Sequence, residues 1–177
     1  MSVPFGPDAA GRGRTLLAQR ALVAAVATVL AFTLDRVTKE LAASQIPLGA
    51  PMQVIGDWVR LAHLHNSGAV FGLLPGSAPI LAYVTLPVLA LIGWAYLRSI
   101  GSSLLAVALL GLVLGAGAGN TLDRALQGYV EDFIDVGLPG GIRFWTFNLS
   151  DSALTLGILA VLLPSLRSRR VPAPGPV

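Results

Sequence analysis

The chain has 177 residues, of which 54% are hydrophobic and 12% are charged. Soluble domains typically carry about 25% charged residues, so this composition excludes an ordinary soluble domain and indicates an integral membrane protein. The net charge of +3 does not indicate a nucleic-acid partner, because arginines in short loops and tails set membrane topology, and the lack of cysteine excludes disulfides and thiolate chemistry.

The first predicted element is a membrane-spanning helix. Residues 1–14 are rich in proline and glycine and predict a disordered cytoplasmic tail. The uncharged run at 21–34 is shorter than the roughly 20 residues needed to cross a bilayer. Since the helical pattern continues, a span at 21–43 carries Asp35 and Lys39 near its outer end. Reading 21–34 as the apolar core of a signal peptide is the alternative, but no other segment would then supply polar groups at this end.

Next comes a mixed segment at 44–79, which predicts a small β-rich extracytoplasmic platform longer than an ordinary connection. Uncharged segments predict two further spans at 80–97 and 103–122. Glycines recur every four residues in the third span, at 111, 115 and 119, which places small residues on one face for close helix packing.

The last uncharged run is too short to span alone, so the fourth span must cover about 146–166 and carry Asp151 in its first turns. Residues 168–177 are Pro-rich and predict a second disordered cytoplasmic tail. The expected fold is therefore an all-α membrane protein, in which residues 15–167 form one domain of four transmembrane helices with the platform.

Charge asymmetry predicts the orientation. With four spans, both termini lie on one side, where Asp8 is the only acid. That side holds seven basic residues: Arg12, Arg14, Arg20, Arg98, Arg167, Arg169 and Arg170. Because basic residues concentrate in cytoplasmic loops, we expect cytoplasmic termini and an acidic cluster at the extracytoplasmic face.

Carboxylates are the chemistry that the chain offers. Neither a G-x-S-x-G nor an H-E-x-x-H motif is present, and two histidines, at 63 and 65, leave little for a metal site; we assign them no role. Two close carboxyls do not both ionise, so one acts as an acid and the other as a base toward water. Asp151 is the acid placed inside a span. Proximity alone leaves three partners: Asp123, Asp132 and Asp135.

Four segments in order resemble the bacterial lipoprotein signal peptidases (signal peptidase II). They are 35–39, 66–72, 119–124 with 128–133, and 147–152. Their order, spacing and four-span layout match the family over roughly residues 20–166. The resemblance implies a membrane aspartic endopeptidase that removes signal peptides from diacylglyceryl-modified prolipoproteins by cutting before the lipidated cysteine, without a metal or organic cofactor.

The resemblance also implies residue roles. It makes Asp132 and Asp151 the catalytic pair. It implies supporting or substrate-binding roles for Asp35, Lys39, Asn66, Gly68, Asn120, Asp123, Arg124 and Asn148. Asp35 and Lys39, four residues apart, are equally consistent with a simple intrahelical pair. The chain departs from the family at Glu131, which stands where valine is usual and adds an acid beside the pair.

Two other classes of function also use membrane acids. A proton-coupled transporter would place its acids nearer the midplane and often shows repeated halves, and a non-catalytic assembly subunit would need no pair. The expected partners are prolipoprotein substrates and membrane lipid, with no nucleic acid. We expect a monomer in the bacterial inner membrane, with both termini cytoplasmic.

Overall fold

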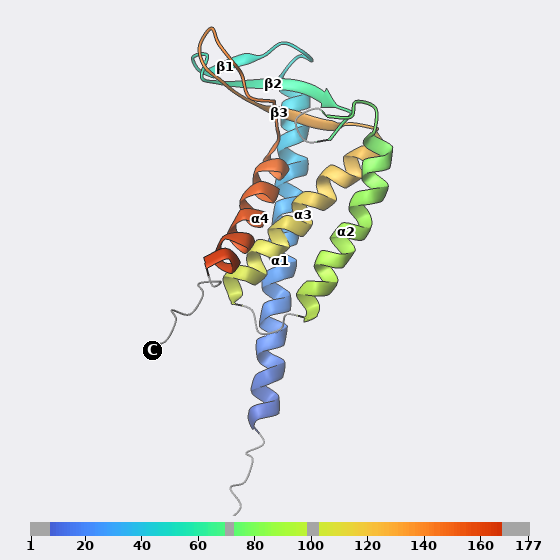
Figure 1. Cartoon of the computed structure of the whole chain (residues 1–177), viewed down its shortest axis with the longest axis vertical. Coiled ribbons are helices and arrows are strands. Elements are labelled where there is room, and N and C mark those ends of the chain that lie inside the picture. The colour runs from blue at the N-terminus through green and yellow to red at the C-terminus, as the bar shows by residue number, and fades with distance from the viewer. Residues whose placement is uncertain (1–7, 70–72, 99–102, 168–177) are drawn as a thin grey trace, which may run out of the picture.

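The computed structural model describes residues 8–69, 73–98 and 103–167. The expected tails at 1–7 and 168–177 lie outside the described residues. In chain order the described elements are α1 (Asp8–Gln45), β1 (Met52–Ile55), β2 (Val59–Asn66), α2 (Ala78–Arg98), α3 (Leu104–Leu126), β3 (Val130–Val136) and α4 (Leu149–Arg167). The helices form a bundle, and the three strands cover one end of it (Figure 1).

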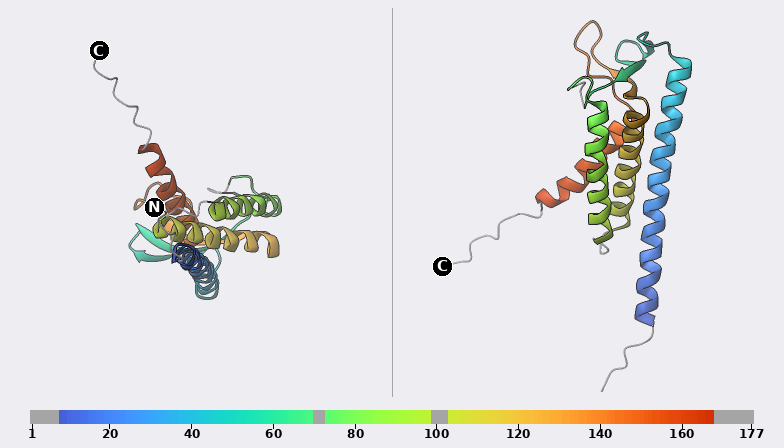
Figure 2. Two further views of the ribbon diagram at one scale, coloured as in Figure 1. Left: turned by 90° about the horizontal axis from the view of Figure 1, so that it is seen from below. Right: turned by 90° about the vertical axis from the view of Figure 1, so that its right-hand side faces the viewer.

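Helix α3 is the centre of the bundle and contacts α1, α2 and α4 (Figures 1 and 2). Glycines allow the close approach to α1. A Cβ atom at Gly111 would lie 2.6 Å from the backbone oxygen of Ala24, and one at Gly115 would lie 2.2 Å from that of Thr28. The predicted packing role of the glycine series is confirmed.

Two described helical segments, Gly11–Gln45 and Leu104–Leu126, are long and apolar enough to cross a membrane. The described apolar parts of the other two helices are shorter, Ala78–Trp94 and Leu149–Ala160. Many large apolar side chains point away from the bundle; Leu22, for example, is 64% exposed. Soluble proteins rarely expose apolar surface on this scale, so these faces suit contact with lipid.

The N-terminal end differs from the expectation. Helix α1 begins at Asp8, so residues 8–14 are helical where a disordered tail is predicted. Ala9 and Ala10 are strong helix formers, and Gly11 and Gly13 each cost only about 1 kcal/mol in a helix interior. The helix therefore continues beyond the near ends of its neighbours (Figure 2).

The sheet has the order β1-β2-β3, and both strand pairs are antiparallel. Strands β1 and β2 come from the predicted platform, but β3 comes from the connection between α3 and α4, where no strand is predicted. Acidic residues are depleted in strands, and β3 carries three of them, at 131, 132 and 135. Phe133 of β3 packs on Ala42 and Ile46 at the end of α1, which fixes the sheet on the bundle.

Candidate active site

The start of α4 holds Asp151 in a defined position. Asn148 precedes the helix, and its Oδ1 accepts a hydrogen bond from the backbone N–H of Asp151 at 3.0 Å. In return, Oδ2 of Asp151 accepts from the backbone N–H of Asn148 at 3.2 Å. This reciprocal pattern is a capping box. As predicted, Asp151 lies in the first turn of the fourth helix.

Asp132 approaches from the sheet. It pairs in register with Leu64 of β2 and is only 3% exposed. Its Oδ2 accepts from Nδ2 of Asn66 at 2.9 Å, and its Oδ1 accepts from Nδ2 of Asn148 at 2.8 Å. Asn148 therefore contacts both aspartates, and it links a residue of β3 to the start of α4.

A third amide, Asn120 of α3, completes the network. Its Nδ2 donates to Oδ1 of Asp151 at 2.9 Å. Its Oδ1 accepts from Asn148 at 3.3 Å and from Nζ of Lys39 at 2.7 Å. Because every amide oxygen here meets a donor and every amide nitrogen an acceptor, the orientations of the Asn120 and Asn148 side chains are determined.

Behind Asn120 lies a buried ionic cluster. Nζ of Lys39 is 2.7 Å from both Asp35 and Asp123, and the three side chains are each 1% exposed. Arg36 forms a second ion pair with Asp123. The intrahelical pair of Asp35 and Lys39 is thus present, and Lys39 also reaches the site through Asn120. The carboxylate of Asp123 therefore contacts Lys39 and Arg36 and not Asp151.

Arg124 and Gly68 fix the residues that directly follow β2. Nη2 of Arg124 donates to the carbonyl of Gly68 at 3.1 Å. The N–H of Gly68 donates to Oδ1 of Asn66 at 2.9 Å, which turns the amide nitrogen of Asn66 toward Asp132. A Cβ atom at Gly68 would lie 2.3 Å from the backbone oxygen of Leu73, so only glycine fits here.

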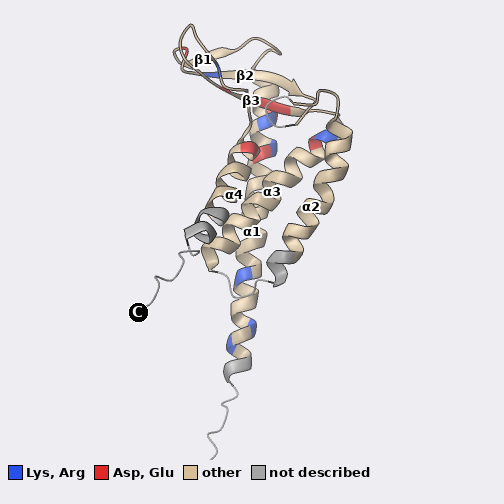
Figure 3. Cartoon of the chain, viewed as in Figure 1, with Lys and Arg blue, Asp and Glu red and all other residues tan. Residues whose placement is uncertain are grey.

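The pKa of Asp132 is higher than that of an ordinary aspartate. Burial is the largest influence that raises the pKa of Asp132, and the negative charge of Asp151 is the next. Hydrogen bonds from Asn66 and Asn148 and the charge of Lys39 lower the pKa, and the net result is a pKa of about 7. Glu131 is not among these influences, because side chains alternate across a strand and that residue faces the other side of the sheet. Figure 3 shows acidic and basic residues gathered where the helices meet the sheet.

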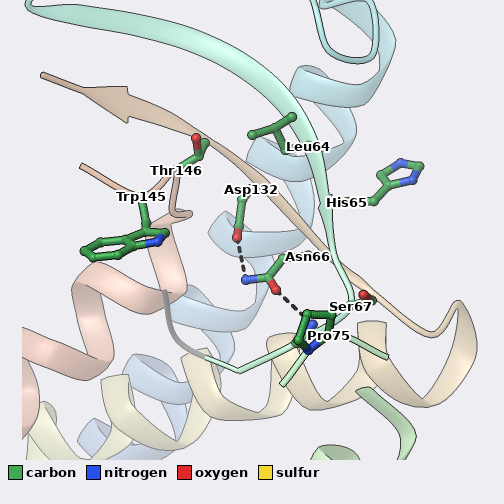
Figure 4. Close-up of a pocket in the computed structure, with 9 residues that line it drawn as sticks. Leu64, His65, Asn66, Ser67, Pro75, Asp132, Trp145 and Thr146 are labelled. Atoms are coloured by element: carbon green, nitrogen blue, oxygen red, sulfur yellow. Dashed lines mark hydrogen bonds between the residues drawn. The ribbon is translucent and has the colours of Figure 1, made fainter. Parts of the chain in front are cut away.

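A cavity of about 280 Å³ opens beside Asp132 (Figure 4). Strand β2 and the loop after it form one wall, with Asn66, Ser67 and Pro75. Trp145 and Thr146, from the segment before α4, form the other. Of these wall residues, Asn66 is predicted by the family resemblance. No local motif marks Trp145 and Thr146, because the pairing of β2 with β3 and the bridge from Ile134 of β3 to Phe147 bring them to the cavity.

The remaining candidate partner, Asp135, is excluded by its contacts. It accepts hydrogen bonds from Nε of Arg143 at 2.8 and 2.9 Å, and it pairs with Arg60 of β2 nearer the other end of the strand. Of the three aspartates left open by proximity, Asp132 alone is joined to Asp151 through a single side chain, that of Asn148; Asp123 is linked to Asp151 only through Lys39 and Asn120. A buried and a half-buried carboxyl in one network beside a cavity, on a bundle with lipid-facing helices, define the class of a membrane aspartic peptidase.

Comparison with known proteins identifies the family. The family described as Signal peptidase (SPase) II matches residues 27–167, and the chain belongs to it. The lipoprotein signal peptidase of Streptococcus pneumoniae is 34% identical over 149 residues, covering 84% of this chain and 95% of the relative. That of Chlorobium phaeobacteroides is 35% identical over 142 residues, covering 76% and 89%.

Solved structures agree with the family assignment. A bacterial membrane enzyme determined by the in meso method at 2.3 Å resolution superposes with a TM-score of 0.74 at 26% identity, covering 90% of this chain and 94% of the other. A second, at 1.9 Å resolution, gives a TM-score of 0.70 at 28% identity, covering 85% and 94%. The chain is thus an aspartic-type endopeptidase of the membrane with lipoprotein signal peptidase function. The predicted family and activity are confirmed.

Proposed function

We propose that Asp132 and Asp151 are the catalytic pair of this peptidase and that they activate a water molecule between them. One observation carries the proposal: a single buried amide, Asn148, binds the carboxyl of Asp132 and caps the helix that presents Asp151. Two carboxyls held in one network share a proton more readily than they ionise together. The raised pKa of Asp132, about 7, supports that residue as the holder of the proton near neutral pH.

The reaction then needs two proton transfers. The ionised carboxyl takes a proton from water as the water attacks the scissile carbonyl carbon, and the protonated carboxyl gives its proton to the carbonyl oxygen or the leaving amine. Asn66, Asn120 and Asn148 hold the carboxyls in place. Lys39, with Asp35 and Asp123, fixes Asn120, while Arg124 and Gly68 fix Asn66.

The substrate of this proposal is a prolipoprotein whose cysteine already carries diacylglycerol, cut just before that cysteine. The cavity beside Asp132 has room for the residues around the scissile bond. Its wall residue Trp145 is 56% exposed, and Trp is characteristic of membrane–water interfaces. An acyl-bearing residue entering from the lipid would reach the carboxyls without leaving the interface.

The proposed topology has four membrane spans. At about 1.5 Å per residue, α2 with 21 residues and α4 with 19 residues are each about 30 Å long, which matches the hydrocarbon core of a bilayer. The part of α1 far from the sheet carries three arginines, Arg12, Arg14 and Arg20 (blue in Figure 3), which supports cytoplasmic termini and an extracytoplasmic site. A monomer is part of this proposal, because one chain supplies both aspartates and the three asparagines that bind them.

The test is cleavage of a diacylglyceryl-modified precursor and its unlipidated form by the purified protein. Asp132→Asn and Asp151→Asn should each lower kcat by at least about a thousandfold while the protein remains inserted and folded. Asp57→Asn, which alters a carboxylate of the platform that binds Arg60 at 2.9 Å, is the matched control and should cleave normally. Substantial cleavage by either of the first two variants removes that residue from the pair, and equal cleavage of both precursors refutes the lipid requirement.

A further inference from the structure

A second cluster of ligating side chains lies on strands β2 and β3, away from the aspartate pair. His65 pairs in register with Glu131, one residue along from the pairing of Leu64 with Asp132. Since side chains alternate across strands, His65 and Glu131 face the opposite side of the sheet from Asp132. Figure 4 shows the ring of His65 pointing away from Asp132. His63, two residues from His65, lies on that same side.

The ligating atoms of these residues converge. Nε2 of His63 lies 2.7 Å from Oε2 of Glu131, and Nε2 of His65 lies 3.5 Å from Oε1 of the same carboxylate. One such atom from each of the three residues falls within 4.8 Å of the others. Two imidazoles and a carboxylate are a ligand set that zinc accepts, with water in the fourth position.

Neighbouring groups orient both rings. Nδ1 of His63 lies 3.0 Å from the backbone carbonyl of Ile46. That oxygen only accepts, so in the neutral ring Nδ1 carries the hydrogen and Nε2 has a lone pair available to a metal ion. A carbonyl on the second ring nitrogen is the usual support of a metal-binding histidine. The ring of His65 stacks on Tyr129 with centroids 3.8 Å apart.

The closest contact in this cluster, between His63 and Glu131, is not a hydrogen bond. Nε2 of His63 and Oε2 of Glu131 are both buried, and among the described residues neither makes a hydrogen bond of acceptable geometry, although they lie 2.7 Å apart. A buried polar atom without a partner is costly, and a cation bound by both atoms would satisfy the two together. Ligand atoms of a tetrahedral zinc site with bonds of about 2.0–2.1 Å lie about 3.3 Å apart, so Glu131 has to withdraw by about half an ångström, which its side-chain torsions permit.

We infer that His63, His65 and Glu131 form a zinc site on the face of the sheet opposite the aspartate pair. The bound ion joins β2 to β3 at the residues adjacent to Asn66 and Asp132. Its role is structural: it holds together the two strands that position these residues, and it takes no part in peptide cleavage.

The test uses the full chain, free of any affinity tag, purified in detergent and stripped of metal with a chelator. Titration with ZnCl₂ near neutral pH, followed by calorimetry and by thermal unfolding, should show one zinc ion bound per chain and a rise in Tm. Glu131→Gln and His63→Gln should each weaken zinc binding at least tenfold. Asp57→Asn, a carboxylate of the same platform that is not a proposed ligand, should bind zinc as the parent protein does.

Two results would overturn the inference. Absence of saturable zinc binding and of any Tm shift would show that a proton alone bridges His63 and Glu131. Unchanged binding in Glu131→Gln would show an adventitious ion only. If that variant fails to fold, His65→Ala serves instead, because the side chain of His65 is 35% exposed; zinc affinity equal to that of the parent protein in this variant would likewise refute the site.

Discussion

Nδ2 of Asn148 lies 2.8 Å from Oδ1 of Asp132, and the same residue caps the helix that carries Asp151. Asn148 is fully buried, so no water competes for its amide. One side chain thereby sets the distance between an acid from a strand and an acid from a helix. The geometry of the pair depends on this amide as much as on the aspartates themselves.

Replacing Asn148 by alanine should therefore damage catalysis more than binding. The variant loses the hydrogen bond to Asp132 and the cap of α4 together, and displacement of a reacting group by about 1 Å can cost about 100-fold in rate. We expect kcat to fall by about that factor, a smaller change in KM, and a loss of about 1 kcal/mol in stability from the cap. Steady-state kinetics on a lipidated precursor, beside thermal unfolding, measure both.

Asn66→Ala is the comparison for that variant, because Asn66 donates to Asp132 but makes no hydrogen bond to Asp151. Its kcat should fall less than that of Asn148→Ala. Equal kcat values for Asn148→Ala and the parent protein would contradict the bridging role.

The pH dependence of cleavage should follow the proton on Asp132. Burial and the charge of Asp151 raise the pKa of Asp132 to about 7, so the carboxyl is protonated below that pH and ionised above it. If the pair needs this proton, kcat/KM declines as pH rises through about 7 and then falls about tenfold per unit. Measuring kcat/KM from about pH 5 to about pH 9 tests this. If kcat/KM does not decline at the alkaline end of this range, the required proton is not on Asp132.

Lys39 should be required for folding as well as for the site. Its ammonium group contacts two buried carboxylates, Asp35 and Asp123, each at 2.7 Å. Lys39→Met leaves Asp35 without its counter-ion, and breaking a buried pair in this way typically costs about 3–5 kcal/mol. Glu40→Gln changes the neighbouring residue, which is exposed, and should stay within about 0.5 kcal/mol. Unfolding in detergent compares the two, and a stable Lys39→Met variant would refute the prediction.

Adding even one methyl group at the contact between α1 and α3 should destabilise the protein. In Gly115→Ala the new Cβ would lie 2.2 Å from the backbone oxygen of Thr28, which is too close for the helices to remain in place. Overpacking of this kind costs about 1–3 kcal/mol. Gly93 of α2 has no atom within 4 Å of an added Cβ, so Gly93→Ala should retain the parent Tm. Equal Tm values for both variants would contradict the packing argument.

The sequence by itself determined the features that depend on local pattern. Apolar runs predict helices, the short last run places Asp151 at the start of the fourth, and glycines at a spacing of four predict a face of the third helix for close packing. These inferences rest on helix period and bilayer thickness, which a single segment carries. The family resemblance then selected Asp132, which the residues alone did not distinguish from Asp123 and Asp135.

Only the tertiary structure decided which partners each acid meets. The pairing of β3 with β2 is a contact between distant segments, and a shift of one residue in its register would exchange the faces of Asp132 and Glu131. The observed register directs Asp132 toward Asn148 and Glu131 toward His63. Likewise Asp123 meets Lys39 because α1 packs on α3, and Asp135 meets Arg143 because the chain returns beside the end of β3. Local sequence specifies which groups a strand carries, whereas their partners follow from how the strands and helices assemble.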